Sequence, residues 1–109
     1  MLQKTLLKDK QKKIIVQYNQ ALKKAGIQAE QIIMFGSYAK GNPKPWSDLD
    51  LCVVSEKFGK DSFAEMVRLA KIAQGVESLI EPHPYNRKDL SDPWDPLAAE
   101  IRIYGKRII

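Results

Sequence analysis

Two short apolar segments, separated by a loop rich in glycine and proline, constrain the fold of this chain most strongly. Residues 31–35 (QIIMF) form a continuous apolar run, and residues 48–55 (DLDLCVVS) form a second run rich in strand-forming side chains. Runs of this length, bounded by turn residues, predict buried β-strands. Between them, Gly41, Pro43 and Pro45 break regular structure. We therefore expect two neighbouring strands joined by an irregular loop.

Helices are predicted around these strands, because apolar residues recur there at spacings of three and four and capping residues stand at the ends. The predicted helices cover residues 3–25, a single turn at 37–40, residues 62–75 and residues 96–104. The apolar stripes comprise Leu6, Leu7, Ile14, Ile15, Tyr18, Leu22 and Ala25 in the first, and Phe63, Met66, Val67, Ala70 and Ala73 in the third. Ser62 and Glu65 are expected to form a capping box.

A third strand is predicted over residues 76–82 (VESLIEP). Pro82 and Pro84 lack backbone donors, so the end of this strand is expected to lie at a sheet edge or to leave the sheet. Short strands that alternate with helices indicate a small α/β domain, and 109 residues fit one such domain, residues 1–109. A single cysteine, Cys52, and the absence of a signal-peptide pattern are consistent with a reducing cytoplasm.

Positive charge is concentrated in the N-terminal segment. Residues 1–24 contain seven lysines and one aspartate, whereas the whole chain has a net charge of +5. A basic face can attract nucleic acid or an acidic partner. No aromatic residues are interleaved with these lysines as in single-strand binders. Composition favours a solvated lysine-rich helix face as the explanation of this charge, so nucleic-acid binding ranks last of three functional hypotheses. No apolar run is long enough to span a bilayer, which excludes a membrane-spanning segment.

Asp48 and Asp50 would lie on the same face of a strand, with carboxylates about 7 Å apart along it. Two such carboxylates repel each other, and a divalent cation such as Mg²⁺ would relieve the repulsion. Upstream, Gly36 allows a ligand to approach the backbone closely, and Ser37 begins a turn whose N–H groups would face an anion. Lys40 is one turn further on. Each half also has an ordinary structural explanation, as a strand start and as a strand-to-helix turn.

The combination is far more specific than either half. An apolar strand ends in Gly36-Ser37, ten residues follow, and Asp48-Leu49-Asp50-Leu51 begins the next strand. This pattern resembles the signature of the DNA polymerase β-type nucleotidyltransferase superfamily. The stretch GSYAKGNPKPWSDLDL is most similar to the small prokaryotic branch called minimal nucleotidyltransferases. The matching positions are Gly36, Ser37, Ala39, Lys40, Gly41, Ser47, Asp48, Asp50 and Leu51.

The resemblance implies a mixed sheet with helices packed on one side, and ATP as the nucleotide. It places the phosphates near Gly36 and Ser37, with Lys40 adding charge, and two Mg²⁺ ions on Asp48 and Asp50. The superfamily also needs a third carboxylate on a later strand. In LIEPHPY the candidate is Glu81, where the family more often has aspartate. Asp48, Asp50 and Glu81 are thus the expected metal ligands and catalytic residues.

In this branch the usual partner is a HEPN-type ribonuclease toxin. The resemblance then implies an antitoxin that transfers AMP from ATP to a tyrosine hydroxyl of the toxin. The sequence leaves a homo-oligomer and a hetero-oligomer open. The alternative is a binding module that neutralises its partner by complex formation alone. The acidic residues Asp48, Asp50 and Glu81 argue against a degenerate site.

Four further residues carry weaker signals. His83, the only histidine, is interpreted mainly as a surface residue in a proline-rich turn, with acid–base chemistry or acceptor contact as the alternative. Tyr85, Trp46 and Trp94 can stack on a base, but packing in the core or at a partner interface explains them equally well.

Overall fold

The computed structural model describes the backbone of residues 2–109 and the side chains of residues 9–109. Its sheet has four strands in the order β3-β2-β1-β4. These strands span β1 Gln31–Phe35, β2 Leu49–Val54, β3 Ile80–Tyr85 and β4 Lys106–Arg107. β1 runs antiparallel to β2 and to β4, whereas β2 and β3 are parallel. The mixed sheet implied by the sequence motif is therefore present.

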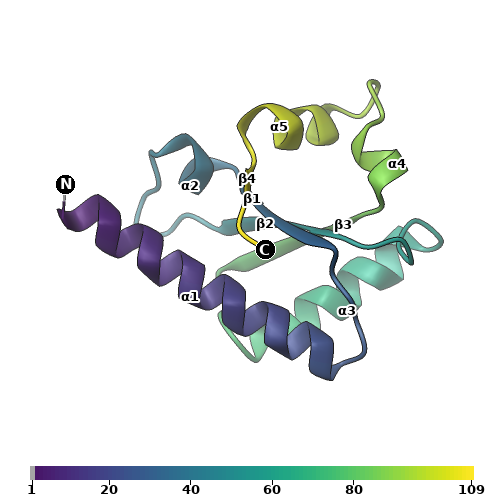
Figure 1. Ribbon diagram of the computed structural model, residues 1–109, viewed down its shortest axis with the longest axis horizontal. Helices are drawn as coiled ribbons and strands as arrows, with labels where there is room; N and C mark the ends of the chain where they lie inside the picture. The colour runs from purple at the N-terminus through teal and green to yellow at the C-terminus, as the bar shows by residue number, and fades with distance from the viewer. Residues whose placement is uncertain (1) are drawn as a thin grey trace.

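The helices lie on both faces of this sheet, and not on one side as the sequence motif implied (Figure 1). They span α1 Leu2–Lys24, α2 Ser37–Lys40, α3 Ser62–Gln74, α4 Arg87–Leu90 and α5 Pro96–Tyr104. The two long helices, α1 and α3, pack together on one face, and α5 partly covers the other. Among the helices of residues 2–109, none is long and apolar enough to cross a bilayer.

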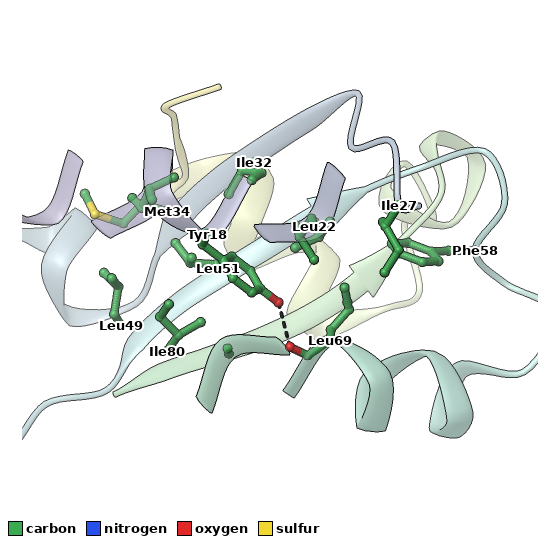
Figure 2. Close-up of a cluster of buried hydrophobic side chains, with 13 residues drawn as sticks. Tyr18, Leu22, Ile27, Ile32, Met34, Leu49, Leu51, Phe58, Leu69 and Ile80 are labelled. Carbon is green, nitrogen blue, oxygen red and sulfur yellow. Dashed lines mark hydrogen bonds between the residues drawn. The ribbon is translucent and has the colours of Figure 1, made fainter. Parts of the chain in front are cut away.

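The larger core fills the space between the sheet and the two long helices (Figure 2). Tyr18 and Leu22 of α1 are fully buried there, as the helical spacing predicted. The Tyr18 hydroxyl donates a 2.8 Å hydrogen bond to the Leu69 carbonyl of α3, which ties the two helices together. Gly26 ends α1 in a left-handed conformation with φ of 83°, the expected C-terminal cap. The predicted contributions of Leu6 and Leu7 lie outside the described side chains.

The predicted apolar face of α3 is correct at Ala73 and wrong at Phe63 and Met66. Phe63 and Met66 are exposed, and the helix is buried through Leu69 and Ala73. The predicted capping box is also replaced, because Asp61 is the N-cap and accepts a hydrogen bond from the Ala64 N–H. The Glu65 carboxylate instead accepts the Gly59 N–H at 2.9 Å. Glu65 lies one turn before Leu69, on the same side of α3. Because its carboxylate binds the loop at Gly59, the first turn of α3 faces a loop rather than the core.

The third strand begins and ends later than predicted, at Ile80 and Tyr85 rather than at 76 and 82. It contains both prolines because it is an edge strand that pairs only with β2. In a parallel ladder, backbone donors alternate between the two sides of a strand. Pro82 and Pro84 are two residues apart, so both lie on the outward side, where no pairing donor is needed. Glu81 and His83 consequently present their backbone to β2.

The remaining elements agree closely with expectation, apart from two that the sequence analysis missed. α5 begins with Asp95 as N-cap, whose side chain accepts the N–H groups of Leu97 and Ala98, followed by Pro96. The short helix α4 and the two-residue strand β4 were not predicted. Both are too short to produce a periodic pattern that distinguishes them from loop.

Candidate active site

The strand register brings two carboxylates together at one end of the sheet. Asp50 of β2 lies opposite Glu81 of β3 in the parallel pair, and opposite Phe35 of β1 on its other side. His83 follows two residues after Glu81, so its side chain projects from the same face of β3. Ligand atoms of Asp50, Glu81 and His83 all lie within 4.8 Å of one another. Three groups that can hold a metal ion therefore converge on one face.

Asp48 stands beside this cluster rather than within it. β2 begins at Leu49, so Asp48 is the exposed residue before the strand and not part of its pleat. Its negative charge nevertheless contributes to raising the pKa of Asp50. Asp48 is thus near enough to act on Asp50 electrostatically, although the expectation that both belong to one strand is wrong by one residue.

The surroundings of Asp50 disfavour the ionised form of its carboxyl. Burial raises the pKa of its carboxyl to about 7, with further contributions from the nearby carboxylates of Glu81, Asp48 and Glu100. Burial disfavours the charged form, and like charges disfavour it further. At neutral pH this carboxyl is therefore poised to take up either a proton or a cation.

His83 is not the surface residue that the sequence analysis favoured. Only 19% of its side chain is exposed, and its ring lies 5.3 Å from the ring of Phe35. Its Nε2 atom is 3.9 Å from Asp50 Oδ1 and 3.9 Å from Glu81 Oε1. Burial lowers the pKa of His83, while the charge of Glu81 acts in the opposite direction. Of these two opposing effects on the pKa of His83, burial is the larger.

Gly36 joins the two halves of the sequence motif in space. It adopts φ of 72° and ψ of −151°, a conformation that a residue with a side chain rarely adopts. A Cβ atom at this position would collide with Asp50 Oδ2 and lie 3.1 Å from Asp50 Cγ. Glycine is required both by the backbone and by the space that Asp50 occupies. The next residue, Ser37, is half-buried and begins α2.

Lys40 is occupied by a partner that the sequence analysis missed. Its Nζ atom lies 2.9 Å from Glu100 Oε1, and 4.9 Å from the ring centroid of Tyr104, both in α5. Glu100 also contributes to the raised pKa of Asp50, so α5 brings a fourth negative charge toward the site. The sequence offered no signal for this contact, because it depends on how α5 docks over the sheet.

The aromatic candidates are dispersed. The Tyr85 hydroxyl donates a 2.7 Å hydrogen bond to Asp95 Oδ2, which anchors the start of α5 to β3. Trp46 and Trp94 are 73% and 89% exposed, so core packing is excluded for both. Trp46 lies under Lys44, whose Nζ is 5.5 Å from its ring centroid.

Comparison with known proteins bears on this arrangement directly. A family model described as a nucleotidyltransferase domain matches residues 8–107. The chain belongs to this family. Its Gly-Ser turn and its Asp-x-Asp motif, which approach each other at Gly36 and Asp50, both lie within the matched residues. No curated protein is similar enough in sequence to count as a match.

Two solved structures share the nucleotidyltransferase fold of this chain. One is a crystal structure of a toxin–antitoxin with AMP-PNP, which has a TM-score of 0.61 and 22% identity over 90% of this chain and 72% of the other. The second is a toxin–antitoxin MntA-HpeT mutant, with a TM-score of 0.56 and 21% identity over 83% and 68% of the two chains. The polymerase β-type fold expected from the motif is confirmed.

Proposed function

We propose that this nucleotidyltransferase domain transfers AMP from ATP to a hydroxyl group of a partner protein. The observation that carries the proposal is the pairing of Asp50 with Glu81 on adjacent parallel strands, against a glycine that the Asp50 side chain requires. Nucleotidyl transfer depends mainly on positioning and on neutralising phosphate charge. Clustered carboxylates beside a close-approach glycine meet that need once a cation is bound.

The three carboxylates fit a divalent cation such as Mg²⁺. Two carboxylates lie together with a third nearby, and one of them has a pKa raised to about 7. Among the side chains of residues 9–109, no lysine or arginine forms an ion pair with Asp50 or Glu81. Asp48, Asp50 and Glu81 would hold the metal, as two ions in the arrangement expected for this family. When bound, these ions neutralise the charge on the phosphates and on the attacking and leaving oxygens.

The chain's own residues would divide the remaining work. Gly36 and Ser37 would lie against the phosphates, and Lys40 would reach them by exchanging Glu100 for the nucleotide. Glu81 would accept the proton from the acceptor hydroxyl. A bond then forms between that oxygen and the α-phosphorus, and the bond between the α- and β-phosphates breaks. The products are an AMP ester of the partner and pyrophosphate.

The proposed acceptor is a tyrosine of a HEPN-type ribonuclease toxin, which would make this protein an antitoxin. Support comes from the two similar structures, both of which are toxin–antitoxin complexes, one of them with the ATP analogue AMP-PNP. In the other, two aspartates separated by one residue are replaced by glutamate, and Asp48 and Asp50 have the same spacing in this chain.

The test is to incubate the purified protein with a HEPN-type toxin encoded beside it, α-labelled ATP and Mg²⁺, and to measure the mass of both chains. One AMP increment on the toxin, mapped to a tyrosine, is the expected result. Asp50→Asn should abolish the increment. Asp9→Asn, the same change at an exposed position of α1, is the matched control. If Asp50→Asn still neutralises the toxin without AMP transfer, complex formation alone accounts for the antitoxin function.

A further inference from the structure

The carboxylate pair has a third donor of different chemistry beside it. His83 Nε2 is 3.9 Å from an oxygen of Asp50 and 3.9 Å from an oxygen of Glu81. Two atoms bound to one ion at about 2.1 Å each lie no more than about 4.2 Å apart. Both separations already satisfy that limit. A single ion can therefore contact the imidazole and one of the two carboxylates without movement of the strands. Ligand atoms of all three residues lie within 4.8 Å of one another, so binding to all three at once requires a small side-chain rotation.

The position of the imidazole is well supported by its surroundings. His83 stands in a strand whose backbone is paired with β2, opposite Cys52. Its neighbours Pro82 and Pro84 have restricted φ angles, which limits local bending of the strand. On its other side the ring packs against Phe35 at an interplanar angle of 59°. Only 19% of the side chain is exposed. These contacts therefore fix the position of the imidazole beside the two carboxylates.

We propose that His83 Nε2 is a protein ligand of the metal bound by Asp50 and Glu81, and that it makes the site prefer Mn²⁺ to Mg²⁺. Mg²⁺ takes hard oxygen ligands and rarely accepts imidazole, whereas imidazole suits the first-row transition metals. Mn²⁺ accepts carboxylate oxygens as well. Because Mn²⁺ is the softer of the two ions, a mixed set of one nitrogen and two or more oxygens favours Mn²⁺ over Mg²⁺. This inference rests on the proposed function for the location of the metal, but concerns which metal is used and which residue selects it.

A purely structural role is the competing explanation, since the ring also packs against Phe35. Two variants separate the roles. His83→Gln removes the imidazole but keeps a polar side chain of comparable length. Phe35→Leu removes the aromatic packing partner but keeps the imidazole. Ligation predicts that only His83→Gln changes metal preference, whereas a packing role predicts that both variants have similar effects.

The first measurement is calorimetric titration of the tag-free protein with MnCl₂ and with MgCl₂, in the absence of nucleotide. For the wild type we expect Mn²⁺ to bind at least roughly tenfold more tightly than Mg²⁺. His83→Gln should weaken Mn²⁺ binding by roughly tenfold or more and leave Mg²⁺ binding within about twofold. Phe35→Leu should keep the Mn²⁺ preference. Circular dichroism of each variant verifies that it is folded.

The second measurement uses the fact that His83 is the only histidine in the chain. In tag-free, ¹⁵N-labelled protein, the imidazole nitrogens give a single set of NMR signals. Addition of the diamagnetic ion Zn²⁺ should shift the Nε2 resonance in the manner of a coordinated nitrogen and leave Nδ1 protonated. Asp50→Asn should weaken this change. An Nε2 resonance that remains in place at saturating Zn²⁺ would overturn the proposal.

These outcomes are independent of whether AMP is transferred. A Mn²⁺ preference that disappears in His83→Gln supports the inference even if no transfer occurs to any toxin. Conversely, transfer with equal Mn²⁺ and Mg²⁺ affinities in the wild type and in His83→Gln would overturn the inference and leave the proposed function intact.

Discussion

The two faces of the sheet are built from the same strands but serve opposite purposes. On the face covered by α1 and α3, β2 presents Leu49, Leu51 and Val53, all buried in the larger core. On the opposite face the same strand presents Asp50, Cys52 and Val54. Only the last two of these are covered by the smaller cluster under α5. The end that carries Asp50 remains open, and β3 adds Glu81 and His83 there.

The difference shows how a short strand combines stability with chemistry. Because side chains alternate between faces, one strand buries apolar residues at every second position and leaves the others available for a site. The buried face fixes the register between β2 and β3, and that register places Asp50 opposite Glu81. A one-residue slip would move the carboxylates to the wrong face.

The largest effect is expected from Asp50→Asn, which changes the open face alone. Loss of this charge should reduce AMP transfer by roughly 100- to 1000-fold, in line with removal of a central electrostatic group. The variant should remain folded, because Asp50 is not part of either apolar cluster. Transfer assays together with thermal melting provide the measurement. Transfer at wild-type levels would contradict the role of this face.

The converse change is Leu51→Ala, next to Asp50 but on the covered face. Leu51 is fully buried, so its truncation should lower the free energy of unfolding by about 2–5 kcal/mol. Transfer per folded molecule, measured well below the melting temperature, should stay within a few-fold of the wild type. Chemical denaturation gives the stability. A larger loss of transfer would mean that the two faces are not separable.

Gly36→Ala is expected to change both the stability of the fold and metal binding on the open face of the sheet. The added methyl would occupy the space of the Asp50 carboxylate, and the positive φ adds a backbone penalty of about 1–3 kcal/mol. We expect reduced stability together with weaker Mn²⁺ and Mg²⁺ binding, because the carboxylate must move. Gly41→Ala is the control, since its φ is also positive but a Cβ there meets no atom within 4 Å. Equal metal affinities in Gly36→Ala and Gly41→Ala would contradict the close contact between Gly36 and the Asp50 carboxylate.

The smallest effect is a pH dependence of the metal-free protein. The folded pKa of Asp50, about 7, lies above its ordinary value of 3.8, so the folded state binds more protons between those limits. Stability should therefore fall as pH rises from about 4 to about 7. Three pKa units correspond to about 4 kcal/mol, but partial solvent access reduces this to about 1–2 kcal/mol.

Asp50→Asn removes this titration and supplies the measurement. With a chelator present, the variant and the wild type should have similar stability near pH 4, and the variant should be more stable at pH 8. The same difference at both pH values would show that the Asp50 carboxyl does not titrate as described.

The sequence was sufficient to predict the helices and strands that are marked by capping residues or by a continuous apolar run. The apolar run of β1 and the Asp95-Pro96 start of α5 were predicted to the residue, because capping and burial leave direct marks. The pairing of Gly36 with Asp50 was foreseen only through the family motif. Its physical cause, the lack of space for a Cβ atom, required coordinates.

The errors arose where a long-range contact overrode a local rule. The prolines led us to end the third strand at Pro82; the sheet edge that we expected for them is confirmed, but both prolines lie inside the strand. That misplacement also hid His83, which was assigned to a surface turn instead of the carboxylate cluster. Glu100 was missed for a related reason, since its contact with Lys40 joins residues 60 positions apart. Tertiary docking of this kind leaves no periodic signal.

The two prolines of β3 also limit how a partner chain can dock. An extended peptide often binds by adding a strand to an exposed sheet edge, where its backbone pairs with free N–H and C=O groups. Beyond β3 such a peptide would meet Pro82 and Pro84 at two consecutive outward positions and find no donor at either. β-Augmentation next to the carboxylates is therefore blocked. If the proposed transfer to a tyrosine takes place, we therefore expect the partner to approach Asp50 over the open face of the sheet.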